Sequence, residues 1–187
     1  MNLSSDPGNE SLAGSLLLAY PGMGDPNFQR TVILLSAHSP GEGSMGVVIN
    51  RPLNKTLADI DPDMQSDPLA EIPIYQGGPV QPDQLILSAW EWSPLESVFR
   101  LFLGIDPDKA RYLQQNHNMH LRAFLGYAGW GQGQLEEELA ENTWIACRIN
   151  EKTIPHEDGL RLWKNLLESI SPTLRLLADR PDDPGKN

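Results

Sequence analysis

Two apolar stretches, Thr31-Val32-Ile33-Leu34-Leu35 and Met45-Gly46-Val47-Val48-Ile49, decide the fold of this chain. Short apolar runs that are rich in β-branched residues are typical of buried strands. The segment that joins them, residues 38–44, contains one proline and two glycines, which favours a tight reversal of the chain. The sequence therefore predicts a β-hairpin whose open end places Arg30 beside Asn50 and Arg51.

Similar signals extend on both sides of the hairpin. Further strands are predicted at residues 15–20, 72–75, 85–87, 98–103, 121–126 and 144–149. Helices are predicted at residues 107–116, 132–141 and 157–170. The first of them has an N-cap and an initial proline, Asp106-Pro107, and Pro172 ends the last. Because strands outnumber helices by about two to one without strict alternation, the fold class is α+β, with a largely antiparallel or mixed sheet.

The charge of the chain limits its partners. The 187 residues include 14 Lys and Arg against 25 Asp and Glu, a formal net charge of −11. No two basic residues are adjacent, so the basic patch that phosphate backbones require is missing from the sequence. Direct binding to nucleic acid or to an anionic membrane surface is therefore disfavoured.

The composition of the chain also bears on its cellular compartment and on its domain organisation. A single cysteine, Cys147, excludes a disulfide within the chain. No apolar run approaches the roughly 20 residues of a membrane-spanning helix, and the first residues lack the basic start of a signal peptide, so we expect a cytoplasmic protein. Residues 1–13 are predicted to form a flexible N-terminal segment, residues 14–171 one domain, and residues 172–187 a polar C-terminal tail.

The glycine-rich segment 126–133 lies between a predicted strand and a predicted helix, where nucleotide-binding folds hold phosphate. Its spacing matches neither standard phosphate-binding fingerprint. The three glutamates at positions 136–138 of the following helix would also repel an anion. We therefore expect a tight strand-to-helix crossing, in which the glycines let Tyr127 and Trp130 pack.

The acidic segment 57–71 imitates a calcium loop in part. Three aspartates between residues 59 and 63 match its first positions, but Met64 and Ala70 stand where such a loop needs glycine and glutamate. Two prolines, Pro62 and Pro68, exclude a long helix here. The segment is therefore expected to be a solvated loop.

Patterns for nucleophilic or metal chemistry are incomplete. Ser44 lacks the glycine two residues before it that a nucleophile elbow needs. His117 and His120 straddle the end of a loop and belong to no metal-binding motif. Cys147 lies in a predicted strand, as a small core residue would. The sequence thus predicts no metal, no cofactor and no complete catalytic constellation.

One polar cluster has two interpretations. The predicted hairpin brings Arg30, Asn50 and Arg51 to one end of the domain, with Asp25 near enough to pair with either arginine. These residues can form a structural ion-pair network that holds the loop ends. The alternative is a pocket for an anion, since arginine recognises carboxylates through two parallel hydrogen bonds.

Several separated motifs make the chain resemble the bacterial AlgH/YqgE family. In order, they are Gly14–Pro21, Asp25–Leu35 with His38, Met45–Pro52, Gly77–Val80, and Gly126–Trp130 with Gly133–Glu136. The resemblance covers about residues 14–170. The chain departs from the family at Leu87-Ser88, where relatives often have Leu-His, and in the polar tail after Pro172.

The resemblance implies an α+β domain whose bent sheet curls into a partial barrel with a few flanking helices. It carries over no catalytic residue, and one branch of the family is linked to transcriptional control of alginate production. The candidates for ligand-binding or family-motif positions are Asp25, Phe28, Arg30, Thr31, His38, Asn50, Arg51, Gly77, Gly78, Pro79, Tyr127, Gly129, Trp130 and Gln134.

Three functions follow as hypotheses. The leading one is a non-enzymatic regulatory or interaction domain that acts through a protein partner or a small ligand and affects transcription indirectly. The alternative is a small-molecule-binding protein or an enzyme with a cleft near Arg30, Asn50 and Arg51, walled by residues 77–79 and 127–130. The third is an oligomeric module that uses Trp90 and Trp92, in a stretch expected to be a loop, as an interface.

Overall fold

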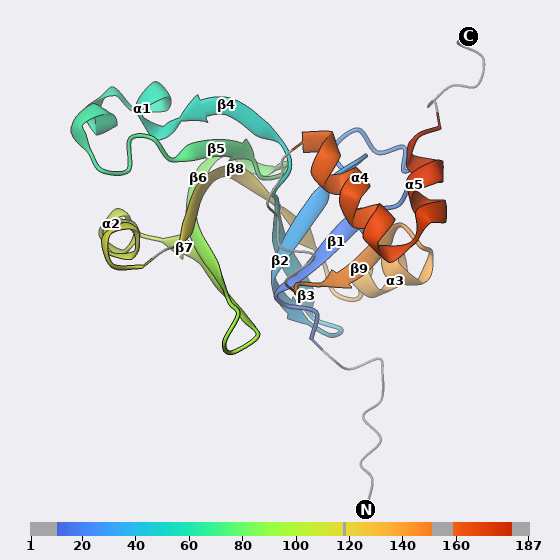
Figure 1. Cartoon of the computed structure of the whole chain (residues 1–187). Coiled ribbons are helices and arrows are strands. Elements are labelled where there is room, and N and C mark those ends of the chain that lie inside the picture. Colours follow the sequence, from blue (N-terminus) through green and yellow to red (C-terminus); the bar gives the residue numbers. More distant parts are fainter. Residues whose placement is uncertain (1–10, 118, 151–158, 181–187) are drawn as a thin grey trace, which may run out of the picture.

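The computed structural model describes residues 11–117, 119–150 and 159–180. Nine strands form one bent sheet in two halves (Figure 1). One half consists of β1 (Ser15–Ala19), β2 (Val32–Ser39), β3 (Gly43–Val48) and β9 (Trp144–Arg148). The other consists of β4 (Pro52–Thr56), β5 (Pro73–Gln76), β6 (Val80–Ser93) and β7 (Val98–Ile105). The ninth strand, β8 (His120–Trp130), belongs to both halves, because it pairs with β3 at one end and with β5 and β6 along the rest.

The sheet is mixed and does not close on itself. Within the described residues, β5 and β8 run parallel, and all other paired strands are antiparallel. The helices are α1 (Leu57–Ile60), the 3-10 helix η1 (Pro62–Ser66), α2 (Pro107–Asn116), α3 (Gln134–Ala140), α4 (Gly159–Ile170) and α5 (Pro172–Ala178). This confirms the predicted α+β class with one bent, mixed sheet. None of these helices, within the described residues, is long and apolar enough to cross a membrane.

The predicted hairpin of β2 and β3 is confirmed. Its register pairs Ile33 with Val48 near the open end and Ser39 with Gly43 at the turn. Both strands extend beyond their apolar runs toward the turn, because cross-strand pairing continues through polar residues once the register is set.

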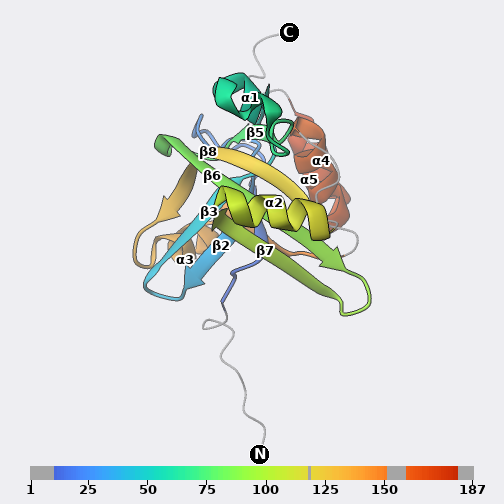
Figure 2. The same cartoon turned by 90° about the vertical axis from the view of Figure 1, so that its left-hand side faces the viewer.

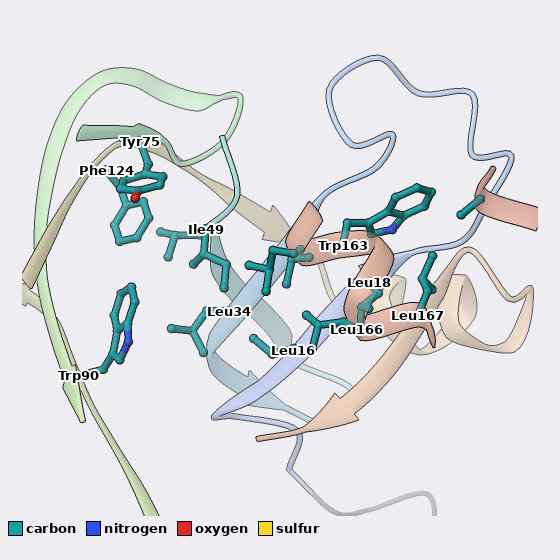
Figure 3. Close-up of a cluster of buried hydrophobic side chains, with 14 of the residues drawn as sticks. Leu16, Leu18, Leu34, Ile49, Tyr75, Trp90, Phe124, Trp163, Leu166 and Leu167 are labelled. Carbon is teal, nitrogen blue, oxygen red and sulfur yellow. The ribbon is translucent and has the colours of Figure 1, made fainter. Parts of the chain in front are cut away.

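Strand β1 is buried on both faces, which explains its uninterrupted run of apolar residues. Leu16 and Leu18 point toward Leu166 on α4, and they share a core cluster with Trp90 and Phe124 from the other half of the sheet (Figure 3). Leu17 and the alternate residues of β2 face a second cluster beneath α3. The apolar stripe of α4 therefore packs on the concave side of the bend, as its helical spacing predicts.

The expected loop around Trp90 and Trp92 is wrong, because both residues belong to β6. Trp90 is 1% exposed and stacks near Phe124, with ring centroids 6.5 Å apart. Trp92 is the cross-strand neighbour of Phe99. Tryptophan alternates with polar residues at period two here, which is typical of a strand. The Ser-Pro pair that follows favours a turn, and this led to the prediction of a loop. A loop of exposed aromatic residues is therefore not available as an interface.

The expected turn at 126–133 is also wrong for most of its length, since β8 continues to Trp130 and pairs there with Ser44 of β3. Gly126, with φ of 70°, adopts the left-handed conformation that glycine favours. It stands where β8 leaves β6 and joins β3. The glycines thus permit the bend of a continuous strand, and only residues 131–133 form the turn into α3.

Two further expectations are corrected. The acidic segment 57–71 contains α1 and η1 rather than only loop, although Pro62 keeps both short by starting the second helix. Pro172 ends α4 but also begins α5, for which Ser171 is the N-cap, so the expected polar tail starts with a helix. The rest of the predicted flexible ends, residues 1–10 and 181–187, lies outside the described residues.

Candidate functional site

The structure brings the predicted cluster together at the open end of the hairpin, where Arg51 holds the preceding loop. Its guanidinium donates to the carbonyl oxygens of Asn27 at 2.8 Å, Gln29 at 3.2 Å and Pro26 at 3.3 Å. Burial lowers the pKa of Arg51, and the nearby Asp25 carboxylate opposes this shift. The Arg51 guanidinium thus stabilises the loop by hydrogen bonds to its backbone carbonyl groups.

The Asn50 side chain also bonds to backbone groups. Its side chain is 4% exposed and makes three hydrogen bonds. Its amide oxygen accepts from Val32 N at 2.8 Å, and its amide nitrogen donates to the carbonyl oxygens of Arg30 at 3.0 Å and Gly159 at 3.1 Å. It therefore ties the end of β3 to the start of β2 and to the first residue of α4.

The loop between β1 and β2 is held by its own side chains as well. The Asp25 carboxylate accepts from Asn27 N at 2.8 Å, and the buried Thr31 hydroxyl donates to the carbonyl of Phe28 at 2.7 Å. The Phe28 ring packs edge-on against Trp144, with centroids 5.6 Å apart. Asp25, Phe28 and Thr31 thus shape the loop from which Arg30 projects.

Arg30 differs from these neighbours because it lines a cavity of about 370 Å³. A second arginine, Arg180, lines the same cavity, and Trp163 and Leu177 provide apolar wall. Arg30 has φ of 59°, a backbone conformation that costs energy for a residue with a side chain and that clusters at functional sites.

The floor of this cavity is a tight turn of the chain. Met23 N donates to the carbonyl of Tyr20 at 3.0 Å across Pro21 and Gly22, and Gly22 has φ of 97°. This is the type II pattern, with proline second and glycine third. Trp163 is fixed beside the turn by a 2.8 Å bond from its indole nitrogen to the carbonyl of Ala19. Hydrogen bonds thus hold both the turn and Trp163 in place beside the cavity.

A separate polar group surrounds His38, whose side chain is nearly buried. Its Nδ1 lies 2.9 Å from the Ser44 hydroxyl, and its Nε2 lies 4.0 Å from a carboxylate oxygen of Glu136 on α3. The amide of Gly41 donates to that oxygen at 3.0 Å and lowers the pKa of Glu136, and His38 adds to the shift. Sequence reasoning did not connect these residues, although His38 and Ser44 are direct cross-strand neighbours in the predicted hairpin.

This group is not built as a nucleophile site. Ser44 lies within β3, which is paired with β2 on one side and with β8 on the other. Its neighbouring amides therefore belong to the sheet, whereas acyl transfer needs free donors for a developing oxyanion. The geometry instead holds the β2–β3 turn against α3.

The candidates on α3 and β8 form a hydrogen-bonded cluster of their own. The amide nitrogen of Gln134 donates to Glu138 at 2.8 Å, and its oxygen accepts from Gly131 N at 3.0 Å. The indole nitrogen of Trp130 also donates to Glu138. The exposed Gly129 lies in β8 opposite Met45. Gln134 thus fixes the turn that starts α3.

The Gly77-Gly78-Pro79 motif marks a close approach of two backbones. A Cβ atom on Gly77 would lie 2.3 Å from the carbonyl oxygen of Gly126, and one on Gly78 would lie 2.2 Å from Tyr127 backbone atoms. The motif therefore needs glycine for packing at the bend of the sheet. Neither it nor residues 127–130 line the cavity beside Arg30, contrary to the cleft that the sequence predicts.

The residues that sequence reasoning missed are those that α4 and α5 bring to the cavity. The sequence places Trp163 only on the apolar stripe of a helix and Arg180 only in the polar tail. The signal for Arg180 was the apolar spacing of residues 174–178, which makes the first part of that tail a helix that packs on α4.

Comparisons with known proteins match most of the chain. The AlgH-like family model matches residues 16–175. A UPF0301 protein of Streptomyces coelicolor is 38% identical to this chain, with 95% of this chain and 96% of that protein aligned. Another, from Myxococcus xanthus, is 38% identical over 86% of this chain and 92% of its own length.

Two known structures share the fold. The solution structure of the AlgH protein from Pseudomonas aeruginosa is 30% identical, covers 97% of this chain and 98% of its own, and superposes with a TM-score of 0.65. A crystal structure of a protein from Corynebacterium diphtheriae covers 94% of both chains with a TM-score of 0.67. Its identity of 21% supports similarity of fold alone.

Proposed function

The chain belongs to the AlgH-like family, and from the cavity beside Arg30 we propose that it is a non-enzymatic regulatory domain that binds a small anionic ligand and acts through a protein partner. The observation that carries this proposal is the pairing of Arg30 and Arg180 in one cavity. In a chain with a net charge of −11, two arginines at one cavity form a local site for an anion.

The size and lining of the cavity suit a small molecule. Its volume of about 370 Å³ lies within the range of roughly 300–1,000 Å³ that is usual for ligand sites. Trp163 and Leu177 offer apolar contact, while the arginines recognise a carboxylate or a phosphate. The ligand class is therefore a small molecule with one acidic group and an apolar part.

The other polar residues of the predicted cluster have structural roles. Asn50 and Arg51 bond to the protein backbone and hold the loop. Arg30 lies in the same loop and lines the cavity together with residues of α5, so a ligand there contacts both the loop and α5. In this way, binding of a ligand would change the surface that a protein partner contacts.

Thermal unfolding with added anions tests the ligand site. Phenyl phosphate and benzoate serve as separate probes, because each has one acidic group and an apolar part, and together they distinguish phosphate from carboxylate recognition. A ligand at 100 times its Kd raises the free energy of unfolding by about 2.7 kcal/mol. We expect Arg180→Gln to abolish this gain without loss of the fold, and Arg30→Gln to abolish it as well.

Arg100→Gln is the matched control, because it removes the same charge from β7, far along the chain from the cavity. It should retain the full stabilisation by the anion. Equal losses in all three variants would show a general charge effect, and no stabilisation of the unmodified chain by either probe would refute the ligand site.

Indirect action on transcription has its own test. A gel-shift titration with duplex DNA at low salt should show no complex, because the acidic surface repels phosphates. Tight binding that weakens steeply with added salt would contradict action through a partner.

A further inference from the structure

A second pocket, with a volume of about 300 Å³, lies where the two halves of the sheet meet. It is lined by residues of β3, β6, β7 and β8, and none of the described residues lines both this pocket and the cavity beside Arg30. Strand β6 lies between β7 and β8 here and pairs with both (Figure 2). The pairing of these strands is irregular around the pocket, and the irregularities determine which side chains reach it.

The largest irregularity is a bulge in β6. Four residues of β6, 81–84, lie opposite the single residue Gly126 of β8. A Cβ atom on Gly126 would lie 3.1 Å from Cα of Pro82, so the bulge packs closely against β8. Bulges are common beside active sites, where they redirect a side chain. This bulge brings Gln81 and Gln84 to the pocket.

Two smaller irregularities border the same pocket. Gly104, which lines it, is the extra residue of β7 at the register shift with β6. Ser36 is the extra residue of β2 opposite β3. The Ser36 hydroxyl donates to the carbonyl oxygen of Met45, another lining residue, at 3.0 Å. Three departures from regular pairing thus converge on one pocket.

Gln81 has a backbone conformation that does not suit glutamine. Its φ is 47°, in the left-handed region that favours glycine and asparagine and costs energy for other residues. Residues held in such conformations cluster at functional sites, where the surrounding structure keeps them in place. The strain at Gln81 therefore occurs at a residue that lines the pocket, within the bulge that forms one of its walls.

Three polar side chains at the pocket are available to a ligand. The carboxamides of Gln81 and Gln84 and the hydroxyl of Tyr127 make no hydrogen bond to any other described residue. Ile86 and Leu103 provide apolar wall, and no charged side chain among the described residues lines the pocket. An ionised ligand would find no opposite charge here, so the pocket suits an uncharged one.

We propose that this pocket binds a neutral aromatic compound that carries a hydrogen-bond donor and an acceptor side by side, as in a carboxamide or a nucleobase. A glutamine carboxamide bonds to such an edge through two hydrogen bonds. The thioether of Met45 and the ring of Tyr127 offer contacts that favour an aromatic ring. The volume is at the lower end of the roughly 300–1,000 Å³ that is usual for ligand sites, so the ligand has one or two rings.

NMR titration with benzamide and with adenine tests the pocket, and the two probes distinguish a carboxamide from a nucleobase. Gln84→Leu and Tyr127→Phe each remove one polar group with little change in shape. Each should weaken binding by about three- to tenfold, the effect of one lost hydrogen bond between neutral groups. Gln65→Leu, at an exposed glutamine of η1, is the matched control and should bind as the original chain does.

Gln81→Asn separates binding from stability. Asparagine is favoured at positive φ, but its carboxamide is one methylene closer to the backbone. The variant should be at least as stable in urea as the original chain and should bind the probes more weakly, by a factor similar to that for Gln84→Leu. Unchanged binding in Gln81→Asn, Gln84→Leu and Tyr127→Phe would overturn the proposal.

Benzoate has nearly the shape of benzamide but carries a charge, so the pair separates this pocket from the cavity beside Arg30. Gln84→Leu should weaken the binding of benzamide and leave that of benzoate unchanged, and Arg180→Gln should do the reverse. Weaker binding of both compounds to the same variant, or no binding of either benzamide or adenine at several millimolar, would refute the second pocket. Binding of benzamide without binding of benzoate would support this pocket and refute the anion site.

Discussion

Trp130 and Trp144 donate their indole N–H groups to the same oxygen of Glu138, at 2.9 and 2.7 Å. The two rings meet edge-on with centroids 5.9 Å apart. One carboxylate on α3 therefore holds β8 and β9 together. In the sequence Glu138 is one of three consecutive glutamates, and nothing there distinguishes it from Glu137 beside it.

Glu138→Gln should destabilise the fold. An amide keeps one acceptor oxygen, but its charge is lost, and hydrogen bonds to charged groups contribute about 1.5–3 kcal/mol each. We expect a decrease of about 2 kcal/mol in the free energy of unfolding, measured by urea denaturation with tryptophan fluorescence. The exposed Glu137→Gln should change it by less than about 0.5 kcal/mol; equal effects of the two substitutions would show that the shared oxygen has no special role.

Gly77→Ala should lower the free energy of unfolding strongly, although it adds only one methyl group. The added methyl group would lie 2.3 Å from the carbonyl oxygen of Gly126, a backbone atom that moves only with β8. We expect a loss of about 3 kcal/mol or more, comparable to severe overpacking. Gly131→Ala is the control, since its nearest neighbour would be a side-chain atom at 3.8 Å. Similar unfolding midpoints for the two variants would contradict the close backbone approach.

Arg51→Lys tests the loop contact without a change in net charge. Lysine has one nitrogen and cannot reach three carbonyl groups in different directions. We expect a loss of about 1–3 kcal/mol in the free energy of unfolding, and faster proteolysis in the loop before β2. The exposed Lys55→Ala nearby should leave both measurements unchanged. An Arg51→Lys protein as stable as the original would mean that the loop is held by its other contacts.

Acid should weaken the ion pair between Asp67 and Arg111, whose guanidinium nitrogens lie 2.6 to 3.2 Å from the carboxylate. The hydrogen bond from Arg111 lowers the pKa of Asp67, and the amide of Leu69 adds to this. A carboxylate whose pKa is lower in the folded chain stabilises it above the unfolded pKa, about 3.9, and this contribution is lost as pH falls through the folded pKa.

The corresponding measurement is urea unfolding of Asp67→Asn at several pH values. The variant should be less stable than the original chain at pH 7, and the two should converge as the pH falls below about 4. The exposed Asp63→Asn should follow the original chain at every pH. A difference between Asp67→Asn and the original that stays constant from pH 7 to pH 3 would show that the charge of Asp67 is not responsible.

Local patterns in the sequence were enough to predict most elements. The β2–β3 hairpin follows from β-branched runs around a turn, and the N-cap Asp106 accepts from Lys109 N at 2.8 Å, as its position before a proline predicts. The long strands β6 and β8 were predicted too short. Some of their pairing partners are distant in sequence, and pairing sustains a strand through serine, proline and glycine, which by themselves favour turns.

For the candidate site, too, the sequence predicts one part and the tertiary structure adds the rest. The sequence alone determined that Arg30, Asn50 and Arg51 meet, because one hairpin register places them at the same end. Only the tertiary structure decided what each does: Asn50 and Arg51 bond to backbone groups, while Arg30 joins Trp163 and Arg180 at a cavity. The physical reason is that turns and amphipathic spacing are local properties of a chain, whereas a cavity forms where α4 and α5 pack against a loop more than 130 residues away.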